Sequence, residues 1–396
     1  MLRSLIDWLA ALADATGTVL TASGSQRWWR LRFLLLFLFF FPPVVVIGQL
    51  TMALDHLLYP GFRDVKIRRP IFIVGQPRTG TTYLYRLLAR DTGSFTSVRF
   101  IDFLLPSIVL KRMAAAVAAL DRAIGAPGLA LLRRIDDAFL PDFAEIHQVG
   151  ILEPEEDEYL LYHTMCSGTL WLMFPTVQRF RRLLFLDTEA SPQEQRLVTA
   201  RYAALVRRHL YHCGPHTTLL SKNPWFTGKI DSLAAAFPDA RFVKLERTPM
   251  QSIASSVSMV HFTWRNTGAL PQGVQDVERW LVVWDHYDRH ARSRFAAMGP
   301  SRAHSVRFAD FVADPQDEVR RLCGALDIAV SPALNDILAG EGARQRKRKS
   351  THRYNLADWG LSEEDVARRF PEAMADAAND VSSATRRPAA RGAPRP

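Results

Sequence analysis

The sequence of 396 residues contains few cysteines, and their spacing fits neither a disulfide framework nor a metal site. Cys166, Cys213 and Cys323 are odd in number and lie far apart, which suits a reducing compartment and predicts no metal cofactor. The chain also lacks an Asn-x-Ser/Thr glycosylation acceptor, which disfavours a secreted glycoprotein. Basic residues are not interleaved with aromatic ones, so we do not expect nucleic acid as a partner.

Positive charge is in excess. The formal net charge is +10, which favours anionic partners such as phosphate, sulfate or anionic lipid. Much of this excess lies in the run RQRKRK at 344–349 and in the C-terminal tail. Because the sequence loses its periodicity from about residue 375, we predict a disordered basic tail over 375–396.

The N-terminal residues 1–66 are predicted to associate with a membrane. An amphipathic helix is expected within 1–24, and the apolar run after Arg32 is long enough to cross a bilayer. Pro42 and Pro43 interrupt this run and are expected to break or kink a helix. Basic residues flank both sides, so the positive-inside rule gives no orientation. A re-entrant or monotopic anchor, a true span and a pair of core helices all remain open.

From residue 67 to 374, short apolar strands alternate with amphipathic helices, which predicts an α/β domain with a P-loop-like, doubly wound parallel sheet flanked by helices. The expected strands are within 70–75, 217–224, 240–249 and 302–308. The expected helices include 192–212, 228–238, 277–298 and 315–328. An apolar, alanine-rich insertion over 104–150 is interpreted as helices that form a lid or one wall of the acceptor site.

The stretch IFIVGQPRTGTTYLYRLL, residues 71–88, predicts a buried strand, a glycine-containing turn and a helix. Gly75, Gly80 and Thr82 have the spacing of a nucleotide-phosphate loop, but Thr81 stands where such loops carry lysine, and Arg78 is the only cation in the loop. Backbone amides before a helix N-terminus bind anions. A donor without a γ-phosphate has less need of the lysine and of Mg²⁺, whereas a P-loop kinase or NTPase would need both.

A second anion pocket is predicted at RTPMQSIAS. Arg247 follows an apolar strand, and Ser255 lies eight residues later on the helix that begins after the proline. This arrangement places a guanidinium and a hydroxyl at one edge of the sheet. A ligand with two separated phosphates would use both this pocket and the loop.

The sequence resembles the sulfotransferase superfamily, in its bacterial-type branch with arginine in the first loop. The resemblance runs from about residue 70 to 370 and rests on VGQPRTGTTYL, PEEDEYLL, LLSKNPWFTGKIDSLAAAFPDARFVKLERTPMQSIAS, RFADFVADPQDEVRRLCGALDI and HRYNLADWGLS. It implies the donor 3′-phosphoadenosine-5′-phosphosulfate (PAPS), with Arg78 and Lys222 as the catalytic cations. It implies a 3′-phosphate pair, Arg247 and Ser255, and a late basic loop that covers it. The other implied donor-binding residues are Gly75, Pro77, Thr79, Gly80, Thr81, Thr82, Lys347, Arg348 and Lys349.

The general base is left among three candidates. Asp102 matches the position of a carboxylate in relatives that carry the loop arginine. Glu156 represents the acidic cluster at 155–158, whose crowded carboxylates raise one another's pKa, although such a cluster also makes an ordinary helix start. A histidine, His147 or His163, is the third possibility.

The acceptor is expected to be a hydroxyl group on a lipid or lipid-linked molecule, because the N-terminus and the insertion are both apolar. A carbohydrate or another small molecule is the alternative, since acceptor pockets vary on a shared fold. The donor is made in the bacterial cytosol, so we expect a membrane-associated enzyme whose catalytic domain faces it.

Overall fold

The computed structural model describes residues 2–139, 150–214, 216–269, 274–345 and 355–376. Its centre is a five-stranded sheet in the order β2-β3-β1-β4-β5, and every neighbouring pair is parallel. The strands are β1 (Ile71–Val74), β2 (Phe95–Thr96), β3 (Thr218–Lys222), β4 (Arg241–Glu246) and β5 (Ala303–Arg307). The α/β class and the four strands expected from the sequence are confirmed. The two-residue strand β2 was not predicted, because it is too short to show a periodicity.

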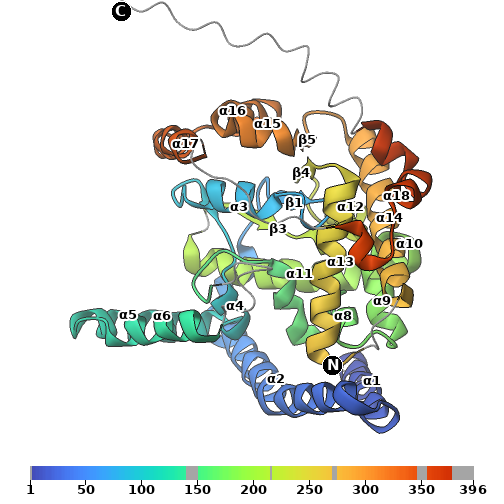
Figure 1. Ribbon diagram of the computed structural model, residues 1–396. Helices are drawn as coiled ribbons and strands as arrows, with labels where there is room; N and C mark the ends of the chain where they lie inside the picture. The colour runs from blue at the N-terminus through green and yellow to red at the C-terminus, as the bar shows by residue number, and fades with distance from the viewer. Residues whose placement is uncertain (1, 140–149, 215, 270–273, 346–354, 377–396) are drawn as a thin grey trace, which may run out of the picture.

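Helices cover both faces of the sheet. Successive residues of β1 enter opposite hydrophobic clusters, because side chains alternate along a strand: Phe72 and Val74 join one cluster, and Ile71 and Ile73 join the other. In Figure 1, α15, α16 and α17 lie above the sheet, and α8, α9 and α11 lie below it. The predicted doubly wound architecture is therefore confirmed.

The helices of the α/β body have the following bounds. On the side of β1 that carries Ile71 they are α3 (Thr81–Ala89), α15 (Phe308–Ala313), α16 (Pro315–Ala325) and α17 (Pro332–Gln345). The others are α4 (Phe100–Leu104), η2 (Asp157–Thr164), α8 (Leu170–Met173), α9 (Gln178–Leu184), α10 (Leu186–Glu189), α11 (Pro192–Cys213), η3 (Pro224–Lys229), α12 (Ile230–Ala236), α13 (Pro249–Thr267), α14 (Val274–Met298), η4 (Leu356–Trp359) and α18 (Glu363–Arg369). The predicted helices over 192–212, 228–238, 277–298 and 315–328 are confirmed within a few residues.

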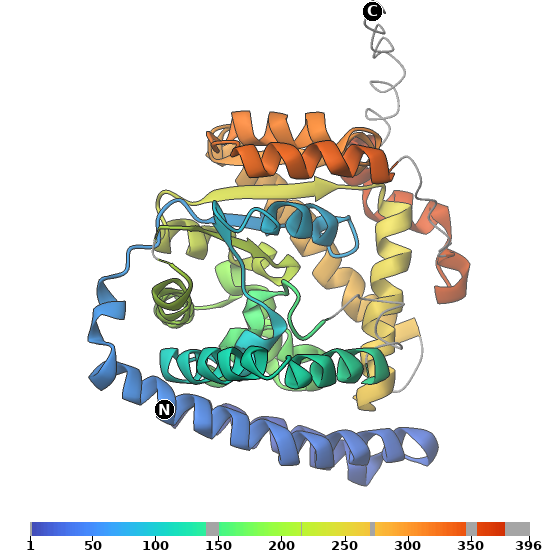
Figure 2. The same ribbon diagram turned by 90° about the vertical axis from the view of Figure 1, so that its left-hand side faces the viewer.

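The described part of the 104–150 insertion is helical, as predicted. It forms α5 (Ile108–Ala123) and α6 (Pro127–Phe139), which are bent by 108° at the break between them. Ser107 caps α5 by accepting a hydrogen bond from the Leu110 N–H, and Asp121 accepts bonds from the Gly128 and Leu129 amides at the start of α6. Figure 2 shows this helix pair running beside α2 on the lower side of the molecule.

The N-terminal region consists of α1 (Leu2–Thr21), α2 (Gly24–Leu58) and the short η1 (Pro60–Asp64). The amphipathic helix expected within 1–24 is present. The expected break at Pro42 and Pro43 is wrong, because α2 continues through both prolines. The buried residues of α2 keep a helical spacing on either side of the prolines, so packing holds the helix in one register; these residues are Arg30, Leu34, Phe37, Val45, Gly48, Met52 and Asp55.

Buried ion pairs join α1 and α2 to the α/β body. The Arg179 guanidinium contacts Asp7 at 2.5 Å, and the Arg208 Nε donates to Asp55 Oδ2 at 2.9 Å. Arg30 pairs with Asp14 and also donates from Nη1 to the carbonyl of Met173 at 2.7 Å. The N-terminal helices therefore share a core with the domain predicted to start at residue 67.

Candidate functional site

The loop between β1 and α3 is compact, and hydrogen bonds with Thr227 fix its first residue. The Thr227 hydroxyl accepts a hydrogen bond from the Gly75 N–H at 2.8 Å and donates one to the Gly75 carbonyl at 2.9 Å. Gly75 and Gly80 both have positive φ, and a Cβ on Gly80 would lie 2.4 Å from the Phe308 ring. Helix α3 begins directly after Gly80 and has no side-chain cap there, so its first amides face the loop.

Arg78 joins the loop to the second predicted anion pocket. Its Nε donates to the Ser255 hydroxyl at 2.9 Å, and its own carbonyl accepts a hydrogen bond from Arg247 Nη1 at 3.0 Å. The backbone of Arg78 is left-handed, with φ of 67°, which is costly for a residue with a side chain. The structure therefore brings together the three residues that the sequence assigned to the donor: Arg78, Arg247 and Ser255.

Lys222 ends β3 at the same edge of the sheet and is buried beside Glu156. The Lys222 ammonium donates to Glu156 Oε1 at 2.7 Å, and the Trp225 indole N–H donates to Glu156 Oε2 at 2.9 Å. Neighbouring parallel strands carry these residues and the loop, because Ile73 of β1 is paired in register with Lys222 of β3. The side chain of Glu156 is only 9% exposed.

Backbone hydrogen bonds between residues 98–100 and residues 153–155 hold the acidic cluster at 155–158 near this edge. Val98 and Phe100 exchange hydrogen bonds with Glu155 and Glu153, which fixes the chain just before Glu156. All four carboxylate residues are buried. The acidic helix start expected here is present, because η2 begins at Asp157, and its carboxylates are buried.

The carboxylates that follow Glu156 have structural partners. Asp157 accepts hydrogen bonds from Ser221 Oγ at 2.9 Å and from the Tyr202 hydroxyl. Glu158 accepts from Lys229 Nζ at 3.0 Å and from the Gly168 N–H at 2.8 Å. Burial raises the pKa of Asp157 to about 6, in spite of the hydrogen bonds that favour its charged form.

Asp102 lies in a different environment from Glu156. It is the third residue of α4, where its Oδ2 accepts from the Arg99 N–H at 2.8 Å, and its Oδ1 forms a buried ion pair with Lys111 of α5. Burial alone would raise the pKa of Asp102, but the charge of Lys111, with a smaller contribution from His209, brings it to about 2. A carboxylate that binds protons so weakly is a poor general base at neutral pH.

The histidine candidates and the late basic loop do not add to the described site. His163 is buried, and its Nε2 lies 2.7 Å from the carbonyl of Phe103, while its ring packs against Gly48 of α2. Burial lowers the pKa of His163 and keeps the ring neutral. The remaining predicted residues, His147, Lys347, Arg348 and Lys349, lie outside the described residues.

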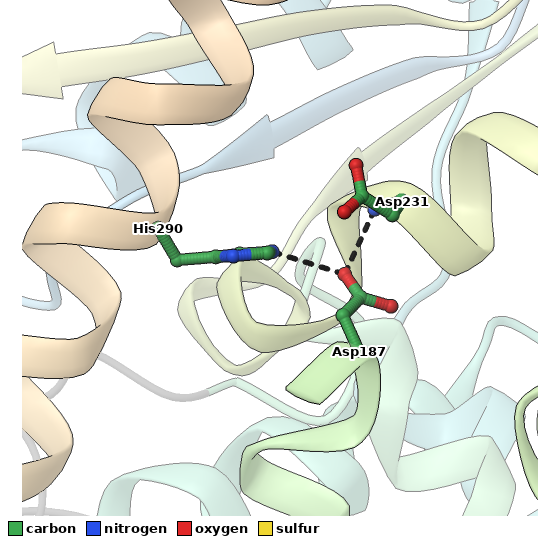
Figure 3. Close-up of side chains that lie close together, drawn as sticks. All are labelled: Asp187, Asp231 and His290. Carbon is green, nitrogen blue, oxygen red and sulfur yellow. Dashed lines mark hydrogen bonds and ion pairs between the residues drawn. The ribbon is translucent and has the colours of Figure 1, made fainter. Parts of the chain in front are cut away.

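One group among the described residues has metal-ligand types close together: Asp187, Asp231 and His290 (Figure 3). Its contacts are those of a helix cap. Both oxygens of Asp187 accept from the first amides of α12, Asp231 N at 2.8 Å and Ser232 N at 3.0 Å. His290 Nε2 lies 3.0 Å from Asp187, and the Asp231 carboxylate pairs with Arg294 at 3.1 Å. We therefore interpret the group as a structural junction between α10, α12 and α14.

Sequence reasoning missed two residues that shape the site. Thr227 clamps Gly75, and Trp225 positions Glu156. Both follow Lys222 within five residues, in the turn η3 that the sequence NPWFTGK forms after β3. Their closeness to Lys222 in the sequence could have indicated that they lie near the site. The directions of their side chains depend on the conformation of η3.

A cavity lies beside the loop between β1 and α3, between the end of β4 and α14. Its lining includes Gly75, Thr79, Glu246, Arg247 and Trp284. The site thus combines an amide-rich loop, two arginines, a buried lysine and a carboxylate. This combination is typical of an enzyme that transfers an anionic group from a phosphate-containing donor.

The chain belongs to the sulfotransferase family, whose model matches residues 70–332. The resemblance noted from the motifs is thereby confirmed. A curated relative is the omega-hydroxy-beta-dihydromenaquinone-9 sulfotransferase Stf3 of Mycobacterium bovis, with 26% identity over 259 residues. Stf3 of Mycobacterium tuberculosis matches equally. The alignment covers 64% of this chain and 61% of the relative's length.

Two solved structures share the fold. The structure of sulfotransferase STF9 from Mycobacterium avium superimposes with a TM-score of 0.69 at 20% identity, covering 93% of this chain and 95% of that one. Sulfotransferase STF1 from Mycobacterium tuberculosis gives a TM-score of 0.67 at 22% identity, covering 91% of this chain and 90% of that one.

Proposed function

We propose that this protein transfers a sulfuryl group from PAPS to a hydroxyl group of a lipid. The observation that carries the proposal is the connection of Arg78 to both Arg247 and Ser255, at the sheet edge that also bears Lys222 and Glu156. A donor with phosphates at its 5′ and 3′ positions needs two anion pockets at a fixed separation. Membership of the sulfotransferase family supports this interpretation.

The loop would bind the 5′-phosphosulfate of the donor. Amides at the start of α3 and the hydroxyls of Thr81 and Thr82 are the donors available in that loop. Arg247 and Ser255 would bind the 3′-phosphate, and Arg78 would lie between the two anionic groups. Pro77, Thr79 and the glycines fix the path of the loop, and Lys347, Arg348 and Lys349 are proposed to complete the 3′-phosphate site.

We propose that Glu156 is the general base and Lys222 the cation beside the transferred group. When the donor binds, the Lys222 ammonium would exchange Glu156 for an oxygen of the phosphosulfate bridge. The acceptor oxygen then attacks sulfur, the bond from sulfur to the bridging oxygen breaks, and the leaving phosphate keeps that electron pair. Glu156 takes the hydroxyl proton and later releases it to water. The ion pair between Lys222 and Glu156 supports this pairing of roles.

A lipid acceptor is supported by the relative Stf3, whose name specifies an omega-hydroxylated dihydromenaquinone. An isoprenoid quinone with a terminal hydroxyl has an apolar chain that matches the exposed apolar helices of this protein. We therefore favour a hydroxylated polyprenyl lipid, with a carbohydrate or other small molecule as the alternative. The catalytic domain would face the cytosol, where the donor is made.

The proposal is tested with the protein, sulfur-labelled PAPS and a host lipid extract, followed by mass spectrometry of the products. We expect a sulfated lipid, formed equally well in EDTA because no step needs a metal. Adenosine 3′,5′-bisphosphate should raise the thermal midpoint, whereas a non-hydrolysable ATP analogue should not. A strict Mg²⁺ requirement with phosphate transfer from ATP would instead support the P-loop kinase alternative.

A further inference from the structure

The exposed apolar side chains of this protein gather on two pairs of helices. Among the described residues, all large apolar side chains that are exposed, except Val282 and Val312, lie on α1, α2 and the segment from α4 to α6. They include Phe39 (72% exposed) and Leu57 (77%) on α2, and Val117 (67%) on α5. Figure 2 shows α2 and the pair α5–α6 side by side at the lower side of the molecule. So large a patch marks an interaction surface.

The acidic side chains of α1 and α2 face the protein, and basic side chains of α2 are exposed. Every carboxylate on these helices, Asp7, Asp14 and Asp55, is buried and paired with an arginine. No exposed carboxylate therefore remains among the described side chains of α1 and α2, while Arg27 and Arg32 are exposed. An outer side with apolar and basic side chains and without exposed carboxylates complements a bilayer that contains anionic lipid.

Helix α2 is long and apolar enough to cross a membrane, as is the bent pair α5–α6. However, α2 is bonded to the α/β body from its first turns to its last. Arg30 donates to Met173, Gln49 donates to the His163 carbonyl at 2.6 Å, and Asp55 accepts from Arg208. If α2 crossed the bilayer, these parts of the body would enter the hydrocarbon with their charges.

We propose that α1, α2, α5 and α6 form one membrane-embedding surface, and that α2 lies in the plane of the bilayer without spanning it. The partner is a lipid bilayer with anionic headgroups. Helix α2 has 35 residues and is about 50 Å long, which exceeds the hydrocarbon thickness of about 30 Å. The inference stands apart from sulfuryl transfer, because membrane binding needs neither donor nor acceptor.

Vesicle flotation tests the surface. The full chain should float with vesicles of phosphatidylcholine and phosphatidylglycerol, and more weakly with phosphatidylcholine alone. Substituting Leu35→Gln, Phe39→Gln and Leu50→Gln together should reduce the bound fraction at least tenfold, and Val117→Gln with Leu120→Gln should reduce it severalfold. The matched control, Val282→Gln with Val312→Gln, alters exposed apolar residues outside the surface and should float normally.

Binding of adenosine 3′,5′-bisphosphate, or the thermal midpoint if the donor assignment fails, verifies that each variant is folded. A wild-type chain that does not float would overturn the proposal. So would a chain that dimerises through these residues in detergent-free buffer and ignores vesicles, because the surface would then be an interface between copies.

Depth measurements distinguish the in-plane helix from a span. A fluorophore is attached at Leu36→Cys, Ile47→Cys or Leu57→Cys, each in a chain carrying Cys213→Ser, and is quenched by lipids brominated at different depths. We expect a shallow depth at all three sites and quenching of all three by an aqueous quencher added outside. A deep central site, or one end shielded from the outer quencher, would show that α2 spans.

Discussion

At the scale of single residues, the two buried carboxylates considered as general base are distinguished by their partners. Asp102 completes the first turn of α4 and neutralises Lys111, whereas Glu156 contacts Lys222 and Trp225. The sequence placed Asp102 among the candidates by its position and Glu156 by the crowding of carboxylates at 155–158. It could not show that Asp102 is paired with Lys111, because Lys111 lies nine residues from Asp102 on another helix.

We predict that Glu156→Gln lowers kcat by about 10²–10⁴-fold and leaves the affinity for adenosine 3′,5′-bisphosphate within about threefold of the wild type, since an amide keeps the shape but cannot take the proton. Asp102→Asn should instead destabilise the protein by about 3–5 kcal/mol, because it leaves the buried Lys111 charge unpaired. Steady-state kinetics and denaturant unfolding measure the two effects. If Asp102→Asn abolished turnover in a protein of normal stability, the roles would be reversed.

Arg78 is predicted to act mainly on the transition state. Arg78→Ala should reduce kcat by about 10²–10³-fold, because charge develops on the leaving oxygen as the bond to sulfur breaks. Arg78→Lys should recover only part of this loss, because an ammonium lacks the planar fork of the guanidinium that also holds Ser255. Binding of the product nucleotide by calorimetry is the companion measurement. An equal loss of affinity and turnover would make Arg78 a ground-state anchor only.

Asp157 should give the protein a pH-dependent stability. Its pKa is raised from 3.8 to about 6 in the folded protein. Between these two pH values, the folded protein therefore keeps a proton that the unfolded chain has released. The contribution of Asp157 to the free energy of unfolding therefore falls by up to about 3 kcal/mol as the pH rises from 4 to 6.5. We expect the thermal midpoint of Asp157→Asn to rise relative to that of the wild type as the pH increases over this range. A difference that stays constant with pH would show that Asp157 is charged throughout.

At the scale of secondary-structure elements, local patterns predicted most strands and helices, and tertiary packing decided the rest. The run before Gly75 and the turn after it follow from local sequence, as do β3, β4 and their helices. The continuity of α2 through Pro42 and Pro43 does not, because it depends on the contacts that its buried stripe makes with α1 and the body. The clamp of Thr227 on Gly75 likewise joins segments 152 residues apart.

The buried contacts between α2 and the α/β body are predicted to contribute a large part of the free energy of unfolding. Asp55 accepts hydrogen bonds from Arg208 and from the Ile108 and Val109 amides at the start of α5. Asp55→Ala should therefore lower the free energy of unfolding by about 3–5 kcal/mol, because it leaves Arg208 buried without its partner. The control is Asp64→Ala, an exposed carboxylate in η1, which should change stability by less than about 0.5 kcal/mol.

Denaturant unfolding in detergent compares these two variants with the wild type. If Asp55→Ala and Asp64→Ala unfold alike, α2 is an appendage of the domain, and the separate region predicted over 1–66 would be the better description. The interpretation as a shared core would then fail.

At the scale of the whole molecule, the parallel sheet gathers at one edge the groups that the sequence scatters over residues 75–255. The sequence predicted this edge because parallel strands end on the same side. It could not predict that the apolar N-terminus and the insertion at 104–150 would lie beside one another, since their neighbourhood arises from the folding of the intervening domain. With the proposed donor site at the sheet and the apolar helices on the proposed membrane surface, the protein would be suited to modify a lipid at a bilayer.

The most direct test of the central claim is transfer of a labelled sulfuryl group from PAPS to an omega-hydroxylated isoprenoid quinone in vesicles, with EDTA present. The wild type should form the sulfate ester. Arg247→Ala should raise the KM for PAPS by about 10–100-fold, as expected for loss of a charged contact worth about 1.5–3 kcal/mol. The exposed Arg265→Ala, on the same helix as Ser255, should match the wild type. Wild-type protein that binds no adenosine 3′,5′-bisphosphate and transfers no label, or an Arg247→Ala variant with unchanged KM, would contradict the account.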